Sequence, residues 1–124
     1  MNVAKILVVD DSGYARRLLR QTLEPLGHAV VEAGSGMAGL EAYAVHAPDV
    51  VLLDLTMEDL GGLEVLTQLR AIDPAARVIV VSADIQRSTG KQVAQAGAFR
   101  FLAKPADAEE LVEAVNAALA EGPP

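Results

Sequence analysis

The sequence contains no cysteine and no tryptophan, and aromatic residues make up only 3 % of it. Without cysteine there are no disulfide bonds and no thiolate metal ligands. A core with so few aromatic rings must consist of valine, leucine, isoleucine and alanine. The hydrophobic fraction of 52 % in 124 residues is ample for one such core, so we expect a single folded domain rather than a disordered segment.

Positive charge is also scarce, since 10 lysines and arginines face 17 acidic residues and the net charge is −7. Binding to DNA or to an anionic membrane surface needs clustered basic residues, so direct nucleic-acid binding is not expected. No apolar stretch approaches the roughly 18 residues of a membrane span, and the apolar N-terminal run is too short for a signal peptide. We therefore expect a cytoplasmic protein without membrane insertion.

Short, mostly continuous apolar runs indicate strands that are covered on both faces. These runs are Lys5–Val9, Ala29–Val31, Val50–Leu53, Arg77–Val81 and Phe99–Leu102. Segments with helical spacing separate them, as in the series Leu63, Leu66, Leu69 and Ile72. This alternation predicts a doubly wound α/β fold, a (βα)5 sandwich whose five-stranded parallel sheet has the flavodoxin-like order 2-1-3-4-5 with helices on both faces.

We assign residues 1–121 to this domain and residues 122–124 to a short Gly/Pro tail, because Gly122-Pro123-Pro124 cannot continue a helix.

The fourth helix, with Gly90 and few apolar anchors, is expected to be the least stable helix. Low stability suits a moving output face and equally a merely frayed helix. We expect His28 at the surface. Arg16, Arg17 and Arg20 form either a solvated helix face or a docking site for a kinase.

Polar residues follow the ends of the predicted strands, where ligands bind in such sheets. Asp10 and Asp11 follow the first strand, Asp54 the third, Ser82 the fourth and Lys104 the fifth. Singly, each also fits an ordinary turn, helix cap or surface position. Together they predict one site.

Asp10 and Asp54 each come directly after a buried run, so their carboxylates repel and lose hydration unless a cation lies between them. Mg²⁺ prefers such hard oxygen ligands, and Mn²⁺ is expected to substitute for it. Histidine or cysteine at metal spacing is lacking, which argues against Zn²⁺.

Four segments of the sequence resemble the receiver domains of two-component response regulators, in particular the chemotaxis-regulator type. They are ILVVDDS around Asp10, DVVLLDLTM around Asp54, VIVVSA around Ser82 and GAFRFLAKP around Lys104, and the resemblance extends from about residue 4 to residue 120. It implies that Asp54 accepts a phosphoryl group from the phosphohistidine of a histidine kinase, from a phosphotransfer protein or from a small phosphodonor. It also implies a signalling switch with slow self-dephosphorylation rather than an enzyme that acts on other substrates.

The resemblance further implies the ligands of Mg²⁺: Asp11 directly, Asp10 mainly through a metal-bound water, the Asp54 carboxylate and the backbone carbonyl of Thr56. Lys104 would pair with Asp54 and later with a phosphoryl oxygen, and Ser82 would donate a hydrogen bond to the phosphoryl group. The bond between Lys104 and Pro105 is expected to be cis.

Signal output would depend on Ser82 and on Phe101, which resembles the rotameric switch aromatic of the family; alternatively, Phe101 is simply an edge-strand packing residue. The resemblance places the downstream partner on the face of the fourth helix, fifth strand and fifth helix. Thr56 and Asp84 occupy the positions that tune dephosphorylation in receivers.

One segment departs from the family pattern. Glu58 replaces the usual proline after the phosphorylated aspartate, and Gly61 replaces the usual aspartate. We expect this loop to be looser and more acidic than usual.

Three other classes of protein compete with this interpretation. A haloacid-dehalogenase-type enzyme needs an acid where Thr56 stands, a flavodoxin-like module needs a phosphate loop where Asp10 and Asp11 stand, and a degenerate receiver would lack the filled site. A stand-alone regulator, a phosphorelay shuttle and a receiver cut from a larger protein all remain open.

Overall fold

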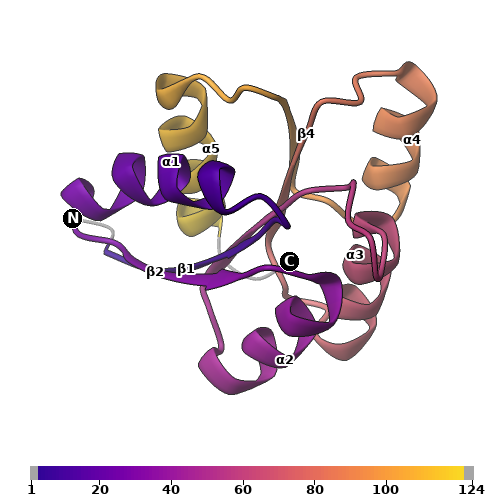
Figure 1. Ribbon diagram of the computed structural model, residues 1–124, viewed down its shortest axis with the longest axis horizontal. Helices are drawn as coiled ribbons and strands as arrows, with labels where there is room; N and C mark the ends of the chain where they lie inside the picture. Colours follow the sequence, from indigo (N-terminus) through magenta and orange to yellow (C-terminus); the bar gives the residue numbers. More distant parts are fainter. Residues whose placement is uncertain (1–2, 122–124) are drawn as a thin grey trace.

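The computed structural model describes residues 3–121, and the predicted tail at residues 122–124 lies outside them. Strands and helices alternate five times along the chain (Figure 1). The strands are β1 (Lys5–Val9), β2 (Ala29–Ala33), β3 (Val50–Leu53), β4 (Val78–Ser82) and β5 (Arg100–Ala103). The α-helices are α1 (Gly13–Leu23), α2 (Gly36–His46), α3 (Gly62–Ile72), α4 (Arg87–Gln95) and α5 (Ala108–Glu121), and a 3-10 turn, η1 (Glu24–Leu26), follows α1.

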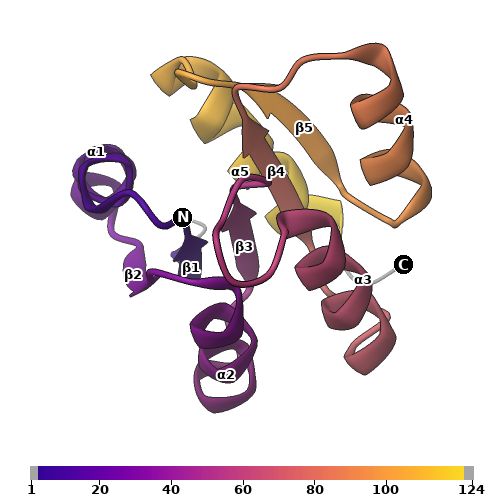
Figure 2. The same cartoon turned by 45° about the vertical axis from the view of Figure 1, so that its right-hand side comes forward.

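The strands form one sheet of order β2-β1-β3-β4-β5, with every neighbouring pair parallel. The doubly wound fold and the strand order predicted from the sequence are therefore confirmed. Helices α1 and α5 lie on one face of the sheet, and α2, α3 and α4 lie on the other (Figure 2).

Two hydrophobic layers enclose the sheet, and β1 contributes to both. Ile6 and Val8 belong to the layer under α1 and α5, whereas Leu7 and Val9 belong to the layer under α2, α3 and α4. Successive side chains of a strand point to opposite faces, so a strand covered on both faces is apolar throughout. This explains the continuous apolar runs. Within residues 3–121, no helix has the length and apolar character needed to cross a membrane.

Two expectations from the sequence were wrong. Ile72 belongs to the apolar series on α3 but is 67 % exposed, since it is the last residue of the helix. His28 is only 6 % exposed, and its Nδ1 accepts a hydrogen bond of 3.1 Å from the backbone N–H of Ala4. The imidazole thus satisfies a buried donor beside β1 instead of facing solvent.

The β3–α3 loop is held more firmly than its glycines suggested. Both carboxylate oxygens of Asp59 accept hydrogen bonds of 3.0 Å from the first backbone N–H groups of α2, those of Gly36 and Met37. At its other end, Gly62 packs closely on the backbone just after β3: a Cβ there would overlap the Asp54 carbonyl oxygen and lie 2.5 Å from Cα of Leu55. The loop that follows Asp54 is therefore fixed at two points.

Gly62→Ala should lower the free energy of unfolding by about 2 kcal/mol or more, because the added methyl group forces the backbone at Asp54 to move. Gly61→Ala is the matched control: a Cβ at Gly61 meets nothing within 4 Å, and its φ of −60° suits alanine. It should change stability by no more than about 1 kcal/mol. Urea unfolding followed by circular dichroism measures both. Equal midpoints for the two variants would contradict the close approach.

Candidate functional site

Three carboxylates gather at the carboxyl ends of the two central strands. Asp10 follows β1, Asp54 follows β3, and one ligand oxygen from each of Asp10, Asp11 and Asp54 lies within 4.8 Å of the others. Asp10 is 2 % exposed and Asp54 is 7 % exposed, whereas Asp11 is exposed. The cluster is thus buried on the strand side and open to solvent at Asp11.

The strand register places these residues side by side. Val9 and Leu53 are partners at the ends of β1 and β3, so the residues that follow them come level. The backbone N–H of Asp54 donates to the Val9 carbonyl at 2.9 Å, and that of Asp10 donates to the Ala33 carbonyl at 3.1 Å. Sheet hydrogen bonding therefore continues through both aspartates and fixes their backbones.

Lys104 lies between the two buried carboxylates. Its Nζ is 2.7 Å from Asp10 Oδ2 and 3.4 Å from Asp54 Oδ1, so the closer partner is Asp10 rather than Asp54. Burial alone would lower the pKa of the lysine, but the hydrogen bond to Asp10 and the charges of both aspartates outweigh burial and raise it. The peptide bond from Lys104 to Pro105 is cis.

The Asp54 carboxylate is in an unfavourable environment for its charge. Burial raises its pKa above the ordinary value and the neighbouring charge of Asp10 acts in the same direction, while Lys104 and the backbone N–H of Thr56 only partly oppose them. Three carboxylates here face one ammonium group. This all-oxygen set with excess negative charge fits a hard divalent cation such as Mg²⁺.

Ser82 and Asp84 connect the edge of the site to α4. Ser82 is fully buried, and its Oγ accepts a hydrogen bond of 3.0 Å from the backbone N–H of Asp84. The Asp84 carboxylate in turn accepts hydrogen bonds from Gln86 N at 3.1 Å and from Thr89 Oγ1 at 2.9 Å. Asp84 thus joins the loop before α4 to the first turn of the helix, through the backbone N–H of Gln86 and the hydroxyl of Thr89. The side chain of Thr56 is exposed beyond β3.

Phe101 lies on β5 and is half-buried against the hydrophobic layer under α2, α3 and α4. A Cβ built on Gly90 of α4 would be 3.6 Å from Cδ2 of the Phe101 ring, so the ring packs beside α4. This position is compatible both with a switch aromatic and with a simple packing residue.

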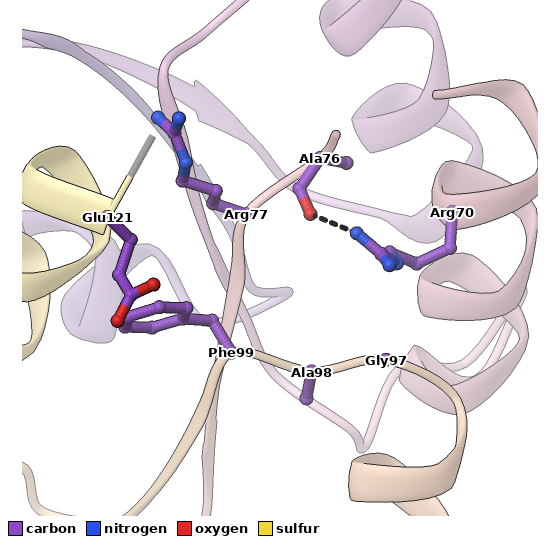
Figure 3. A pocket seen from close by; sticks show the side chains of 7 residues that line it. All are labelled: Arg70, Ala76, Arg77, Gly97, Ala98, Phe99 and Glu121. Carbon is purple, nitrogen blue, oxygen red and sulfur yellow. Dashed lines mark hydrogen bonds between the residues drawn. The ribbon is translucent and has the colours of Figure 1, made fainter. Parts of the chain in front are cut away.

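Two surface hollows lie at opposite ends of the strands. A largely apolar groove of about 420 Å³ runs between α1 and the start of α5; Tyr14, Leu18 and Lys104 line it, so it adjoins the carboxylates. A second hollow, of about 250 Å³, lies at the amino ends of β4 and β5 (Figure 3). There Arg70 donates a hydrogen bond to the Ala76 carbonyl at 2.9 Å, and no residue of the acidic cluster takes part.

Sequence reasoning missed one contact at the site. Arg16 donates a hydrogen bond of 2.6 Å to the backbone carbonyl of Asp10. Its helical position offered no signal for this contact, because the direction of the side chain depends on Glu32 of β2, which pairs with it at 2.9 Å.

Fold and site together define a doubly wound α/β domain with an acidic, lysine-containing site at the carboxyl edge of its sheet. The family model of the response regulator receiver domain matches residues 6–116, and the chain belongs to this family. It is therefore a receiver domain of the two-component response-regulator type.

Individual relatives agree with this assignment. The chain is 39 % identical over 116 residues to the chemotaxis protein CheY of Bacillus subtilis, an alignment that covers 93 % of this chain and 97 % of that one. It is 37 % identical over 124 residues to the DNA-binding transcriptional regulator NtrC of Azospirillum brasilense, covering 100 % of this chain but 26 % of NtrC. A crystal structure of a CheX–CheY–BeF3–Mg²⁺ complex from Borrelia burgdorferi matches with a TM-score of 0.87 and 30 % identity, covering 91 % of this chain and 87 % of that chain.

In EDTA at neutral pH, Asp54→Asn should be more stable than the wild type, since it removes a buried like charge while Lys104 keeps its closer partner, Asp10. The folded-state pKa of Asp54 is raised, so the cost of its charge is fully present above that pKa. The cost declines as the pH falls through it and vanishes below the unfolded value of about 3.9. The two urea midpoints should therefore converge on acidification.

Glu58→Gln is the control for this experiment, because it removes the same charge at an exposed position. It should shift the unfolding free energy by no more than about 0.5 kcal/mol. A lower midpoint for Asp54→Asn than for the wild type at pH 7 would show that the Asp54 charge stabilises the fold.

Proposed function

We propose that this receiver domain accepts a phosphoryl group on Asp54 in a Mg²⁺-dependent reaction. The donor is the phosphohistidine of a histidine kinase or phosphotransfer protein, or a small phosphodonor. The observation that carries this proposal is the buried pair Asp10 and Asp54, with Asp11 and Lys104 beside it. Family membership agrees with it.

The residues that would hold Mg²⁺, or Mn²⁺ in its place, are Asp11, Asp10 through a water molecule, the Asp54 carboxylate and the Thr56 carbonyl. When bound, the ion supplies positive charge to the transferring phosphoryl group. Supporting evidence comes from the related CheY of Borrelia burgdorferi, which crystallised together with BeF3 and Mg²⁺.

Three residues of the chain have the other roles in phosphoryl transfer. A carboxylate oxygen of Asp54 attacks phosphorus, so a P–O bond forms to Asp54 while the P–N bond to the donor histidine breaks. The Lys104 ammonium, 3.4 Å from Asp54 Oδ1, neutralises charge on a phosphoryl oxygen. Ser82 donates its hydroxyl hydrogen to the phosphoryl group. Such transfer depends mainly on positioning and charge neutralisation.

The phosphorylated site would act on α4, β5 and α5, the face proposed for a downstream protein, through Ser82 and Phe101. Phe101 packs beside α4, and Asp84 joins Ser82 to the start of that helix. Slow hydrolysis of the aspartyl phosphate would end the signal in the cytoplasm. The chain spans nearly all of CheY but about a quarter of NtrC, so a stand-alone regulator, a shuttle and a part of a larger protein remain alternatives.

Incubation with acetyl phosphate or a phosphorylated histidine kinase, together with Mg²⁺, should add a single phosphoryl group to the wild-type protein. Asp54→Asn should remain unlabelled because it lacks the nucleophile, and excess EDTA should prevent labelling of the wild type. Intact-mass spectrometry measures the added group, and Glu58→Gln controls for the loss of one nearby acidic group. Labelling of Asp54→Asn to the wild-type extent would refute the proposal.

Thr56→Arg should slow the loss of the phosphoryl group about five- to tenfold, equivalent to roughly 1 kcal/mol in the barrier, by shielding it from water. We choose this single change over a partner change at Asp84, because Asp84 also binds Gln86 and Thr89 at the start of α4. Loss of radiolabel from purified phosphoprotein in Mg²⁺ buffer gives the rate. The control is Thr67→Arg, the same change on the exposed face of α3. A decay rate for Thr56→Arg within twofold of wild type would exclude a gating role.

A further inference from the structure

The guanidinium of Arg16 lies against the backbone of the acidic β1–α1 loop. Nη1 donates to the Asp10 carbonyl at 2.6 Å, and Nε donates to Glu32 Oε1 at 2.9 Å. Gly34 leaves room for this group, since a Cβ there would be 3.3 Å from Nη1. Arg16 thus bridges from α1 to β2, the edge strand beside β1 (Figure 1).

This contact completes the set of partners around Asp10. Its N–H donates to the Ala33 carbonyl, its Oδ1 accepts from the backbone N–H of Ser12 at 2.9 Å, and its Oδ2 accepts from Lys104 at 2.7 Å. The Asp10 carbonyl belongs to the peptide unit that joins Asp10 to Asp11. A donor that fixes this carbonyl therefore fixes the direction in which both carboxylates leave the backbone.

We propose that Arg16 is a positioning residue for the cation site: it orients the peptide between Asp10 and Asp11 and thereby sets the affinity for Mg²⁺. This inference rests on the proposed function, because it presumes that these carboxylates bind the cation. Arg16 is not among the residues proposed to hold the ion.

The charge of Arg16 and its hydrogen bond to Asp10 have opposite effects on the affinity for Mg²⁺. The ion pair with Glu32 determines which effect is larger. A free guanidinium near the site would repel the cation, so its removal would tighten binding. Arg16, however, is paired with Glu32 at 2.9 Å, and Glu32 also pairs with Arg20 at 2.7 Å. Arg20 also pairs with Glu24 at 2.7 Å, so two arginines face two glutamates in this network. The positive charge of Arg16 is therefore largely compensated, and its hydrogen bond to the loop is the larger contribution.

Arg20 provides a matched control. Both arginines bind the Glu32 carboxylate, but Arg20 directs its remaining hydrogen bonds to Glu24 and to the Val30 carbonyl rather than to Asp10. Each variant removes one charge from the same network; Arg16→Gln removes one ion pair and Arg20→Gln removes two. A merely structural role would therefore affect Arg20→Gln at least as much, whereas a positioning role affects only Arg16→Gln.

Calorimetric titration of the full chain with Mg²⁺ tests the proposal. Arg16→Gln should raise the Kd for Mg²⁺ about three- to tenfold, as expected for the loss of one hydrogen bond that orders the ligands. Arg20→Gln should stay within about twofold of the wild type. Arg16→Lys should also bind Mg²⁺ more weakly than the wild type, because one ammonium cannot reproduce the planar fork that spans Asp10 and Glu32. Backbone amide shifts of residues 10–12 should change in Arg16→Gln but not in Arg20→Gln.

The contrary outcomes are distinct. A wild-type Kd for Arg16→Gln, a tighter one, or equal weakening in Arg20→Gln would overturn the proposal. A wild-type Kd for Arg16→Lys would overturn it as well, because the planar fork that spans Asp10 and Glu32 would then not be needed for Mg²⁺ affinity. If the wild type does not bind Mg²⁺ at all, the proposed function fails first, and this inference fails with it.

Discussion

The mutual repulsion of two buried carboxylates is the constraint on which the rest of this structure depends. The parallel register of β1 and β3 brings Asp10 and Asp54 to the same level at the edge of the sheet, with little water to screen them. Lys104 reaches both carboxylates, yet one ammonium cannot neutralise the cluster, and the pKa of Asp54 remains raised. The fold therefore maintains a site whose charge is balanced only when a further cation is present.

Much of this arrangement was predictable because it depends on local sequence. A strand covered on both faces must be a continuous apolar run, and an aspartate directly after such a run must lie at the carboxyl edge of a parallel sheet. Asp10 and Asp54 satisfy that condition, and Ser82, the last residue of β4, lies at the same edge. The residues next to Lys104 did not by themselves distinguish it from a surface lysine. Only the resemblance of the segment GAFRFLAKP to receiver domains did so.

The contacts that escaped prediction join residues far apart in the chain. His28 reaches Ala4, Asp59 reaches the start of α2, and Arg16 reaches Glu32. Each is a single polar residue without periodicity, and the partner follows from tertiary packing rather than spacing. Asp59 shows the consequence most clearly: two glycines suggested a loose loop, but one carboxylate bound to two backbone N–H groups anchors it.

A series of local hydrogen bonds would allow a small change at the site to reach the surface. Ser82 Oγ accepts a hydrogen bond from the backbone N–H of Asp84, whose carboxylate binds Gln86 and Thr89 at the start of α4. This helix buries only Val93, whereas α3 buries Gly62, Val65, Leu66 and Leu69. Apolar burial supplies most of the free energy that holds a helix on a sheet, so polar contacts such as those of Asp84 contribute a larger share for α4 than for α3. A hydroxyl that turns from the Asp84 amide toward a new anion at Asp54 would weaken a connection on which α4 depends and α3 does not.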